Sequence, residues 1–360
     1  MKQWIDSKKV MVCCGAGGVG KTTLSAALAL ECARQGHRTL VLTIDPSLRL
    51  AQALGVKRNS PEPLAVSTEF LGGSSALGGS LDAWMLDPQV ISDKAVVTIL
   101  GKDRKSEAEV QRFLRNRVYG KISQFISGMQ EYTALKALSE FIDSGRYDRI
   151  ILDTPPSRHA LDFLDAPTRV AEFLEGRIFQ MFAPTERGWL GRAAGSVVQK
   201  VVKAVFGESF AQEMTEFISL FSGVFQYLNA DLARVRSYLA GAEAGFWVVS
   251  SPRPAPLEEA RFFLRRSSEL KLPVLGVVLN QGVEGAVQEE TAESFSAQEP
   301  ELLRQLVRLE NHWIQQERVL LQSFKSSKEM LNVPVYSIPW VQPSGEVGHQ
   351  LRDLMQSVRE

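Results

Sequence analysis

The chain has 360 residues, and its 41 Lys and Arg residues balance its 41 Asp and Glu residues, so it carries no formal net charge at pH 7. Proteins that bind nucleic acid or acidic membranes through charge have a basic excess, so we expect neither partner. No apolar run approaches the roughly 18 residues of a membrane span, and none at the N-terminus suggests a secretory signal. We therefore expect a cytoplasmic protein.

Short apolar runs alternate with helical patterns, which is typical of strands buried on both faces of a parallel sheet. In chain order, the predicted strands are residues 10–14, 39–44, 81–86, 149–152, 246–250, 274–280 and 333–338. The predicted helices are residues 21–35, 89–100, 107–144, 256–270 and 299–324. Residues 67–80 and 282–298 are predicted loops. This order predicts an α/β fold with a doubly wound, mostly parallel sheet flanked by helices.

The stretch from Arg169 to Gly241 differs from the rest because it contains no strand candidate. From Phe210 to Leu239 its apolar residues recur in steps of three and four, as on one face of a long helix. We therefore predict an α/β core formed by residues 1–168 and 242–360, with an α-helical insertion over residues 169–241.

The segment GAGGVGKT, from Gly15 to Thr22, fits the GxxxxGK[ST] pattern of a phosphate loop without a mismatch. It lies between a predicted strand and a predicted helix, where backbone N–H groups and the helix N-terminus favour the phosphates of ATP or ADP. Lys21 is expected to reach the β- and γ-phosphates, and Thr22 to coordinate Mg²⁺. The nucleotide-binding residues predicted here are Gly15, Gly17, Gly18, Val19, Gly20, Lys21, Thr22 and Thr23.

Two aspartates follow predicted strands and are candidates for a role near Mg²⁺ and for the positioning or activation of water. Asp153 ends the run at 150–152, where a carboxylate near Mg²⁺ is expected in a P-loop NTPase. Asp45 follows the run at 39–44 and could point across the carboxyl ends of the strands toward the γ-phosphate, to position or activate water. The alternatives are a strand-end turn for Asp153 and a helix N-cap before Ser47 for Asp45.

Five segments, in order along nearly the whole chain, resemble the ArsA-type anion-transporting ATPases. This family includes the arsenite-pump ATPase and the ATPases that target tail-anchored membrane proteins, and it belongs with MinD and ParA to the deviant P-loop class. The segments are the phosphate loop, TIDP with LAQAL at 43–54, DTPPSRHAL at 153–161, GVVLNQ at 276–281, and IP with EVG at 338–348.

The resemblance implies an ATPase that uses Mg²⁺, with Asp45 as the water-activating residue and with Asn280 and Pro339 at the adenine. It also implies a dimer that closes with ATP and opens with ADP. Within the family, the chain is most similar to bacterial members that look like one half of a paired, two-gene system.

The chain departs from the family pattern at Ala16, where the family has a lysine that reaches the phosphates of the partner subunit. A homodimer would lack this cation at both sites, so a paralogue could supply it in a heterodimer. The zinc CxxC of some targeting members and the As(III)-binding cysteines are absent, since the three cysteines are Cys13, Cys14 and Cys32. These absences argue against arsenite pumping.

Several functions stay open at this point. The first is a switch that holds a hydrophobic membrane-protein client in a groove of the insertion by a helix-in-groove mode. The second is a partner-regulated switch of the MinD or ParA kind, and metalloid efflux or a P-loop kinase is less favoured. The residues of the candidate groove, which could equally be core of the insertion, are Phe173, Leu174, Ile178, Phe179, Met181, Phe182, Phe210, Met214 and Phe217.

Overall fold

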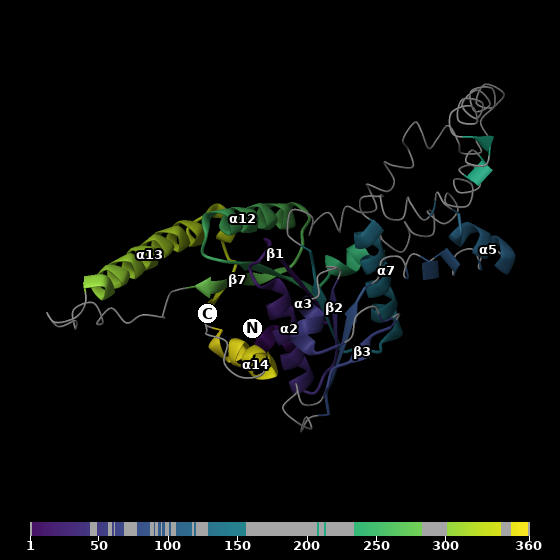
Figure 1. Cartoon of the computed structure of the whole chain (residues 1–360), viewed down its shortest axis with the longest axis horizontal. Coiled ribbons are helices and arrows are strands. Elements are labelled where there is room, and N and C mark those ends of the chain that lie inside the picture. The colour runs from purple at the N-terminus through teal and green to yellow at the C-terminus, as the bar shows by residue number, and fades with distance from the viewer. Residues whose placement is uncertain are drawn as a thin grey trace. The chain divides into compact units, whose positions relative to one another are not determined.

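The apolar runs form one eight-stranded sheet in the computed structural model, with the strand order β3-β4-β2-β5-β1-β6-β7-β8 (Figure 1). Among these strands every pairing is parallel except that of β3 with β4. The central strands β1 and β6 are buried at every position, as expected where helices cover both faces of a parallel sheet. The strands are β1 Val10–Gly15, β2 Arg38–Thr43, β3 Leu64–Ala65, β4 Ser80–Met85, β5 Arg149–Asp153, β6 Ala244–Ser250, β7 Val274–Gly282 and β8 Val335–Pro339.

The chain folds as two units. One comprises Met1–Met85, Gly145–Leu161 and Tyr238–Glu360, and the other comprises Leu86–Ser144 and Asp162–Ser237. The structure describes residues 2–43, 49–56, 60, 62–67, 78–86, 90, 93–94, 96–97, 101, 106–116, 119, 129–155, 207–208, 212–213, 234–282, 301–339 and 347–358. Most of the predicted insertion at 169–241, including all nine candidate groove residues, lies outside the described residues, so the insertion stays a prediction.

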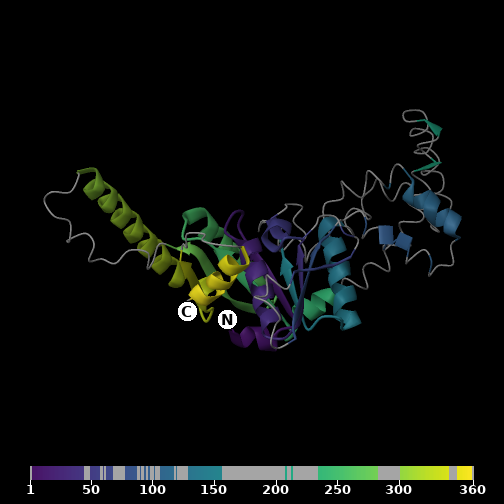
Figure 2. The same ribbon diagram turned by 60° about the horizontal axis from the view of Figure 1, so that its bottom comes forward.

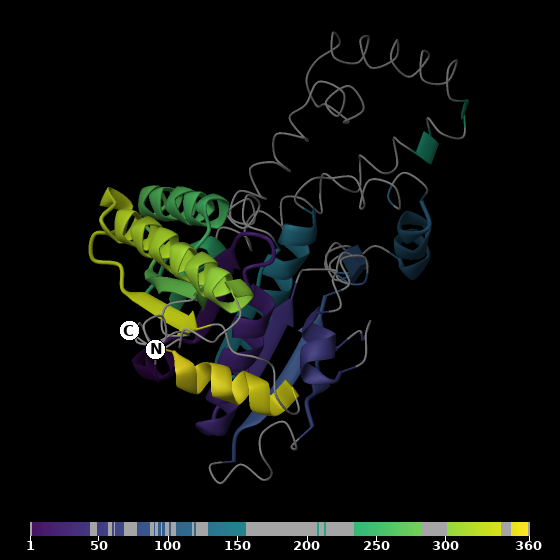
Figure 3. The same ribbon diagram turned by 60° about the vertical axis from the view of Figure 1, so that its left-hand side comes forward.

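In the first unit, helices lie on both faces of the sheet (Figures 1 and 3). Helix α2 shares the core of one face with Met11 and Cys13 of β1, and α14 packs beside α2 on the same face (Figure 2). On the other face, the ring of Phe263 in α12 lies 6.4 Å from that of Phe246 in β6. The described helices of this unit are α1 Lys2–Ser7, α2 Lys21–Arg34, α3 Arg49–Leu54, α12 Pro254–Glu269, α13 Glu301–Lys325, the 3-10 helix η2 Lys328–Met330 and α14 Val347–Ser357.

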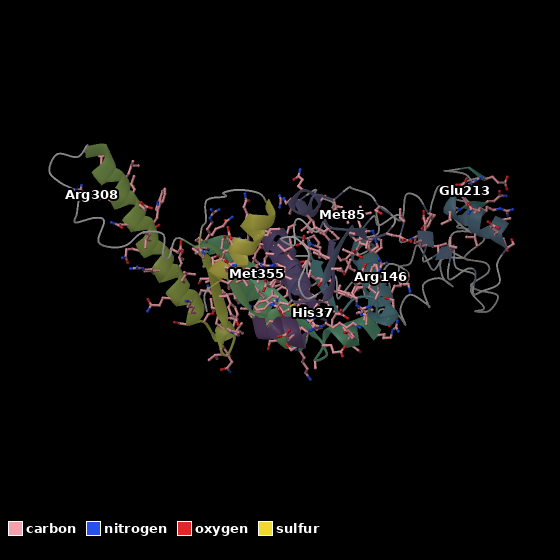
Figure 4. All side chains as sticks on the ribbon, turned by 90° about the horizontal axis from the view of Figure 1, so that it is seen from below. His37, Met85, Arg146, Glu213, Arg308 and Met355 are labelled. Carbon is pink, nitrogen blue, oxygen red and sulfur yellow. The ribbon has the colours of Figure 1, made fainter. Side chains whose placement is uncertain are left out.

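The predicted α/β fold with a mostly parallel sheet is confirmed, and each of the seven predicted strands has a counterpart within two residues at either end. Helix α14 was missed, although Leu351 is buried and Met355 packs against the core (Figure 4). Among the described residues, no helix combines the length and apolar character needed to cross a membrane.

The single helix predicted over 107–144 is wrong. In the second unit, α5 Glu107–Leu114 ends before Asn116, and α7 Met129–Ser144 is a separate helix. The side chain of Asn116 accepts a hydrogen bond from the N–H of Tyr119 at 3.3 Å and donates one to the carbonyl of Glu213 at 2.9 Å. An asparagine that bonds the backbone in this way favours a helix boundary over a helix interior, which explains the break.

Candidate nucleotide-binding site

The phosphate loop links the end of β1 to the start of α2. Gly15 ends β1, and a Cβ on this residue would lie 2.0 Å from the carbonyl oxygen of Val249 in β6, so only glycine fits there. Gly20 is the N-cap of α2 and has a φ of 92°. Glycine adopts this left-handed conformation without the steric cost that a side chain would add. The turn presents the first N–H groups of α2 at the carboxyl edge of the sheet, as in an anion-binding loop.

Lys21 is the first residue of α2, and its side chain folds back along the loop. Its Nζ donates a hydrogen bond to the carbonyl oxygen of Ala16 at 2.7 Å, and the residue is only 7 % exposed. The ammonium group is therefore held at the phosphate loop itself, as expected for a lysine that contacts phosphates. Ala16 is also buried, and its side chain belongs to the core that α2 shares with the sheet.

Asp153 lies at the end of β5, next to β1, and is fully buried. Its Oδ2 accepts hydrogen bonds from the hydroxyls of Thr22, at 2.8 Å, and Thr43, at 3.1 Å. Its Oδ1 accepts one from Ser25 at 3.3 Å. The carboxylate is thus fixed by side chains of α2 and β2, and the structure brings together the two residues predicted to bind Mg²⁺.

The donor set around Thr22 and Asp153 fits Mg²⁺. Mg²⁺ takes oxygen ligands, and its protein sites commonly supply one or two of them while phosphates and water supply the others. Thr22 donates its proton to Asp153, so the lone pairs of its hydroxyl oxygen are directed away from the carboxylate and can face a cation. These two residues would hold the ion at the N-terminal turn of α2.

Asn280 lies near the end of β7 and contacts the phosphate loop. Its Nδ2 donates a hydrogen bond to the carbonyl oxygen of Val19 at 2.9 Å. Pro339 pairs with Gly282 at the ends of β8 and β7, so both residues predicted near the adenine lie at the carboxyl edge of the sheet. The contact of Asn280 with the loop was not predicted from the sequence.

The remaining predicted site residues are placed as follows. Gly17 and Gly18 are exposed in the loop, and Thr23 is exposed on the first turn of α2. Asp45 lies outside the described residues, as do residues 156–161 of the DTPPSRHAL segment, so the role of Asp45 stays a prediction. Ser25 and Thr43, which hold Asp153, were not predicted; Ser25 carries a signal, since it is three residues after Thr22 on the same helix face.

The cysteines beside the loop do not form a thiolate site. All three are free and buried. Burial in the core raises the pKa of Cys14 to about 12, and it raises the pKa of Cys13 further. Both thiols are enclosed in the core, whereas reactive and metal-binding cysteines are partly exposed. This agrees with the argument against arsenite binding.

Comparisons with known proteins agree with the motifs. A family model described as anion-transporting ATPase matches residues 8–326. An uncharacterized protein of Streptomyces coelicolor is 28 % identical over 70 % of this chain and 57 % of its own length. An ATPase ASNA1 homologue of Paramecium tetraurelia is 23 % identical over 74 % of this chain and 73 % of its own length.

The arsenical pump-driving ATPase of Escherichia coli is 24 % identical over 67 % of this chain, which spans only 39 % of that protein. The chain likewise spans less than two thirds of the Streptomyces relative. The likeness therefore concerns a part of these longer proteins.

Proposed function

Because the chain belongs to the ArsA family of anion-transporting ATPases, we propose that its phosphate loop binds ATP with Mg²⁺ and that the protein hydrolyses ATP to ADP and phosphate. The observation that carries this proposal is the hydrogen bond of 2.8 Å between Thr22, in a complete phosphate loop, and the buried carboxylate of Asp153. A Mg²⁺–nucleotide site requires a threonine of the phosphate loop close to a carboxylate. A glycine-rich turn that arose by chance would not need such a pair.

In this mechanism the residues of the chain position the phosphates and neutralise their charge. The N–H groups of the loop and of the first turn of α2 bind the phosphate oxygens, and Lys21 adds a positive charge. Ser25 and Thr43 hold the Asp153 carboxylate, so Thr22 and Asp153 keep one orientation as charge develops. Bound Mg²⁺ would supply further charge neutralisation at the β- and γ-phosphates. Asp45 is the proposed residue that positions or activates the attacking water.

We also propose that the nucleotide controls a dimer, closed with ATP and open with ADP. The resemblance of five ordered segments supports this, and Ala16 favours a heterodimer with a paralogue that supplies the missing lysine. The proposed client is a hydrophobic membrane protein bound by the insertion at residues 169–241. The resemblance to ATPases that target tail-anchored membrane proteins and the apolar steps of three and four in that segment support a client-handling role, which we propose for the cytoplasm.

ATP turnover, measured per molecule across a wide range of protein concentration, tests the ATPase proposal, with Lys21→Ala as the blank. Turnover above the blank that rises to a plateau indicates a self-sufficient homodimer. Binding of Mg–ATP with turnover at the blank level indicates an ATPase that needs a partner subunit. If the wild-type protein binds Mg–ATP no more tightly than Lys21→Ala, the proposed function is wrong.

A further inference from the structure

The side chain of Asn280 connects the end of β7 to the phosphate loop across 261 residues of sequence. Its Nδ2 lies 2.9 Å from the carbonyl oxygen of Val19. The loop also closes tightly on this amide, since a Cβ on Gly20 would lie 2.2 Å from Nδ2. A carbonyl oxygen only accepts hydrogen bonds, so the amide group that faces Val19 must be the NH₂ group.

A bulge follows Asn280 at the end of β7. Asn280 pairs with Ile338 of β8 and Gly282 pairs with Pro339, which leaves Gln281 as an extra residue between the two pairs. Gln281 has a φ of 64°, in the left-handed region that residues with side chains rarely adopt. Bulges that re-aim a side chain and strained backbone of this kind are typical of functional sites.

The bond to Val19 fixes the direction of the next N–H group as well as that of the Val19 carbonyl. In a trans peptide unit, the C=O of one residue and the N–H of the next lie in one plane and point in opposite directions. A donor that holds the Val19 carbonyl therefore also sets the direction of the Gly20 N–H. Gly20 is the N-cap of α2, so this N–H belongs to the set that faces phosphate in the proposed function.

We propose that Asn280 is a positioning residue for the phosphates: it holds the Val19 carbonyl and thereby orients the Gly20 N–H. This inference rests on the proposed nucleotide site but differs from the adenine contact that the family resemblance implies for Asn280. The bond to Val19 uses Nδ2 and leaves Oδ1 for a base, so the two roles are compatible. They are separable by experiment, because only the positioning role acts on a ligand that has no base.

The test compares the affinities of the full-length chain for Mg–ATP and for Mg–tripolyphosphate, which has the phosphates alone. Asn280→Ala should weaken both by a similar factor, about two- to tenfold, as expected for the loss of one hydrogen bond. Gln322→Ala is the matched control, because it removes an exposed amide from α13 and should change neither affinity. Far-UV circular dichroism and thermal melting establish that each variant is folded.

A second pair of variants tests the bulge without removing Asn280. Gln281→Gly accepts the left-handed conformation and should bind both ligands as the wild-type protein does. Gln281→Val disfavours it and should weaken both ligands, as Asn280→Ala does. In the ligand-free protein, amide hydrogen exchange in the peptide that contains Val19 and Gly20 should be faster in Asn280→Ala than in the wild type.

Two results would overturn the inference. Weaker binding of Mg–ATP with unchanged binding of Mg–tripolyphosphate would mean that Asn280 contacts only the base. Unchanged binding of both ligands, with unchanged hydrogen exchange in the loop, would mean that the Val19 bond positions nothing. Lys21→Ala separates these outcomes from failure of the proposed function. If the wild-type protein and Lys21→Ala bind tripolyphosphate equally, the loop is not the phosphate-binding site. The proposed function and this inference are then both wrong.

Discussion

Thr22 and Asp153 are 131 residues apart in the sequence, yet the hydroxyl of Thr22 donates a hydrogen bond of 2.8 Å to the carboxylate of Asp153. The contact arises because β5 is the neighbour of β1, so that the end of β5 lies beside the loop that follows β1. Parallel strands thus place a carboxylate and a hydroxyl from separate segments at one edge of the sheet.

Asp153→Asn should reduce Mg²⁺-dependent ATP turnover by about 100-fold or more, equivalent to roughly 2.7 kcal/mol of barrier. The amide keeps the shape of the side chain, but it removes the negative charge and places an NH₂ group against hydroxyl donors. Turnover measured as a function of Mg²⁺ concentration should depend less on the ion in the variant than in the wild-type protein. Asp148→Asn is the control, since Asp148 lies just before β5 and pairs with Arg38 at the amino edge of the sheet. Equal loss in both variants would contradict the role of Asp153.

The Arg38–Asp148 pair itself should make stability depend on acid pH. The hydrogen bond from Arg38 is the main cause that lowers the pKa of Asp148 from 3.8 to about 2. Because the folded-state pKa is depressed, the pair stabilises the fold above the unfolded pKa near 4, and this contribution is lost as pH falls toward 2. The pair is exposed to solvent, which screens it, so its contribution to stability is small.

Melting temperatures of the wild type and Asp148→Asn, compared from pH 7 to pH 2, test this dependence. The variant should melt at a lower temperature at pH 7, and the difference should shrink below pH 4. A difference that stays constant down to pH 2 would mean that the ion pair is not its source.

The sequence predicts the sheet well because most of its strands are apolar runs, and the central strands β1 and β6 are buried at every position. It misses β3, which has two residues, one half-buried and one exposed. It also misses α14, although Val347, Leu351 and Leu354 recur at helical spacing within a polar segment. The break between α5 and α7 coincides with the hydrogen bonds of Asn116 to Tyr119 and to Glu213, and no local pattern reveals the second bond, which spans 97 residues.

The candidate site likewise contains residues that could be predicted from the sequence and residues that could not. Residues of the phosphate loop could be predicted because a short motif specifies backbone geometry and chemistry together. Thr43 could not, because its bond to Asp153 depends on the pairing of β2 with β5. The contact of Asn280 with Val19 joins segments 261 residues apart, and no local sequence pattern reveals it.

Gly20→Ala should weaken Mg–ATP binding more than Gly18→Ala does. Both glycines have a positive φ, of 92° and 76°, so alanine carries a similar backbone cost of about 1 kcal/mol at either position. Only at Gly20 does the new Cβ meet a neighbour, the Nδ2 of Asn280, whereas a Cβ at Gly18 has nothing within 4 Å. The amide must move away from Val19 to admit the methyl group, and its hydrogen bond is then lost.

Calorimetric titration of both variants and of the double variant Gly20→Ala with Asn280→Ala measures this coupling. In the double variant the losses should be less than additive, because the alanine at position 20 no longer displaces an amide. Additive losses would mean that Gly20 and Asn280 act on binding independently.

Ala16→Lys should raise the ATP turnover of the chain on its own by about tenfold or more. A homodimer of the wild-type chain would lack the cation that the family resemblance places at the partner's phosphates, and added charge of this kind stabilises a phosphoryl-transfer transition state. Ala16→Gln is the control, since it adds a long side chain at the same buried position without the charge.

Turnover of all three proteins should be measured as a function of concentration, because a cation that acts across a dimer has an effect only where dimers form. If Ala16→Lys is no faster than Ala16→Gln while both bind Mg–ATP as the wild type does, the missing lysine does not limit this chain, and the argument for a heterodimer from Ala16 fails.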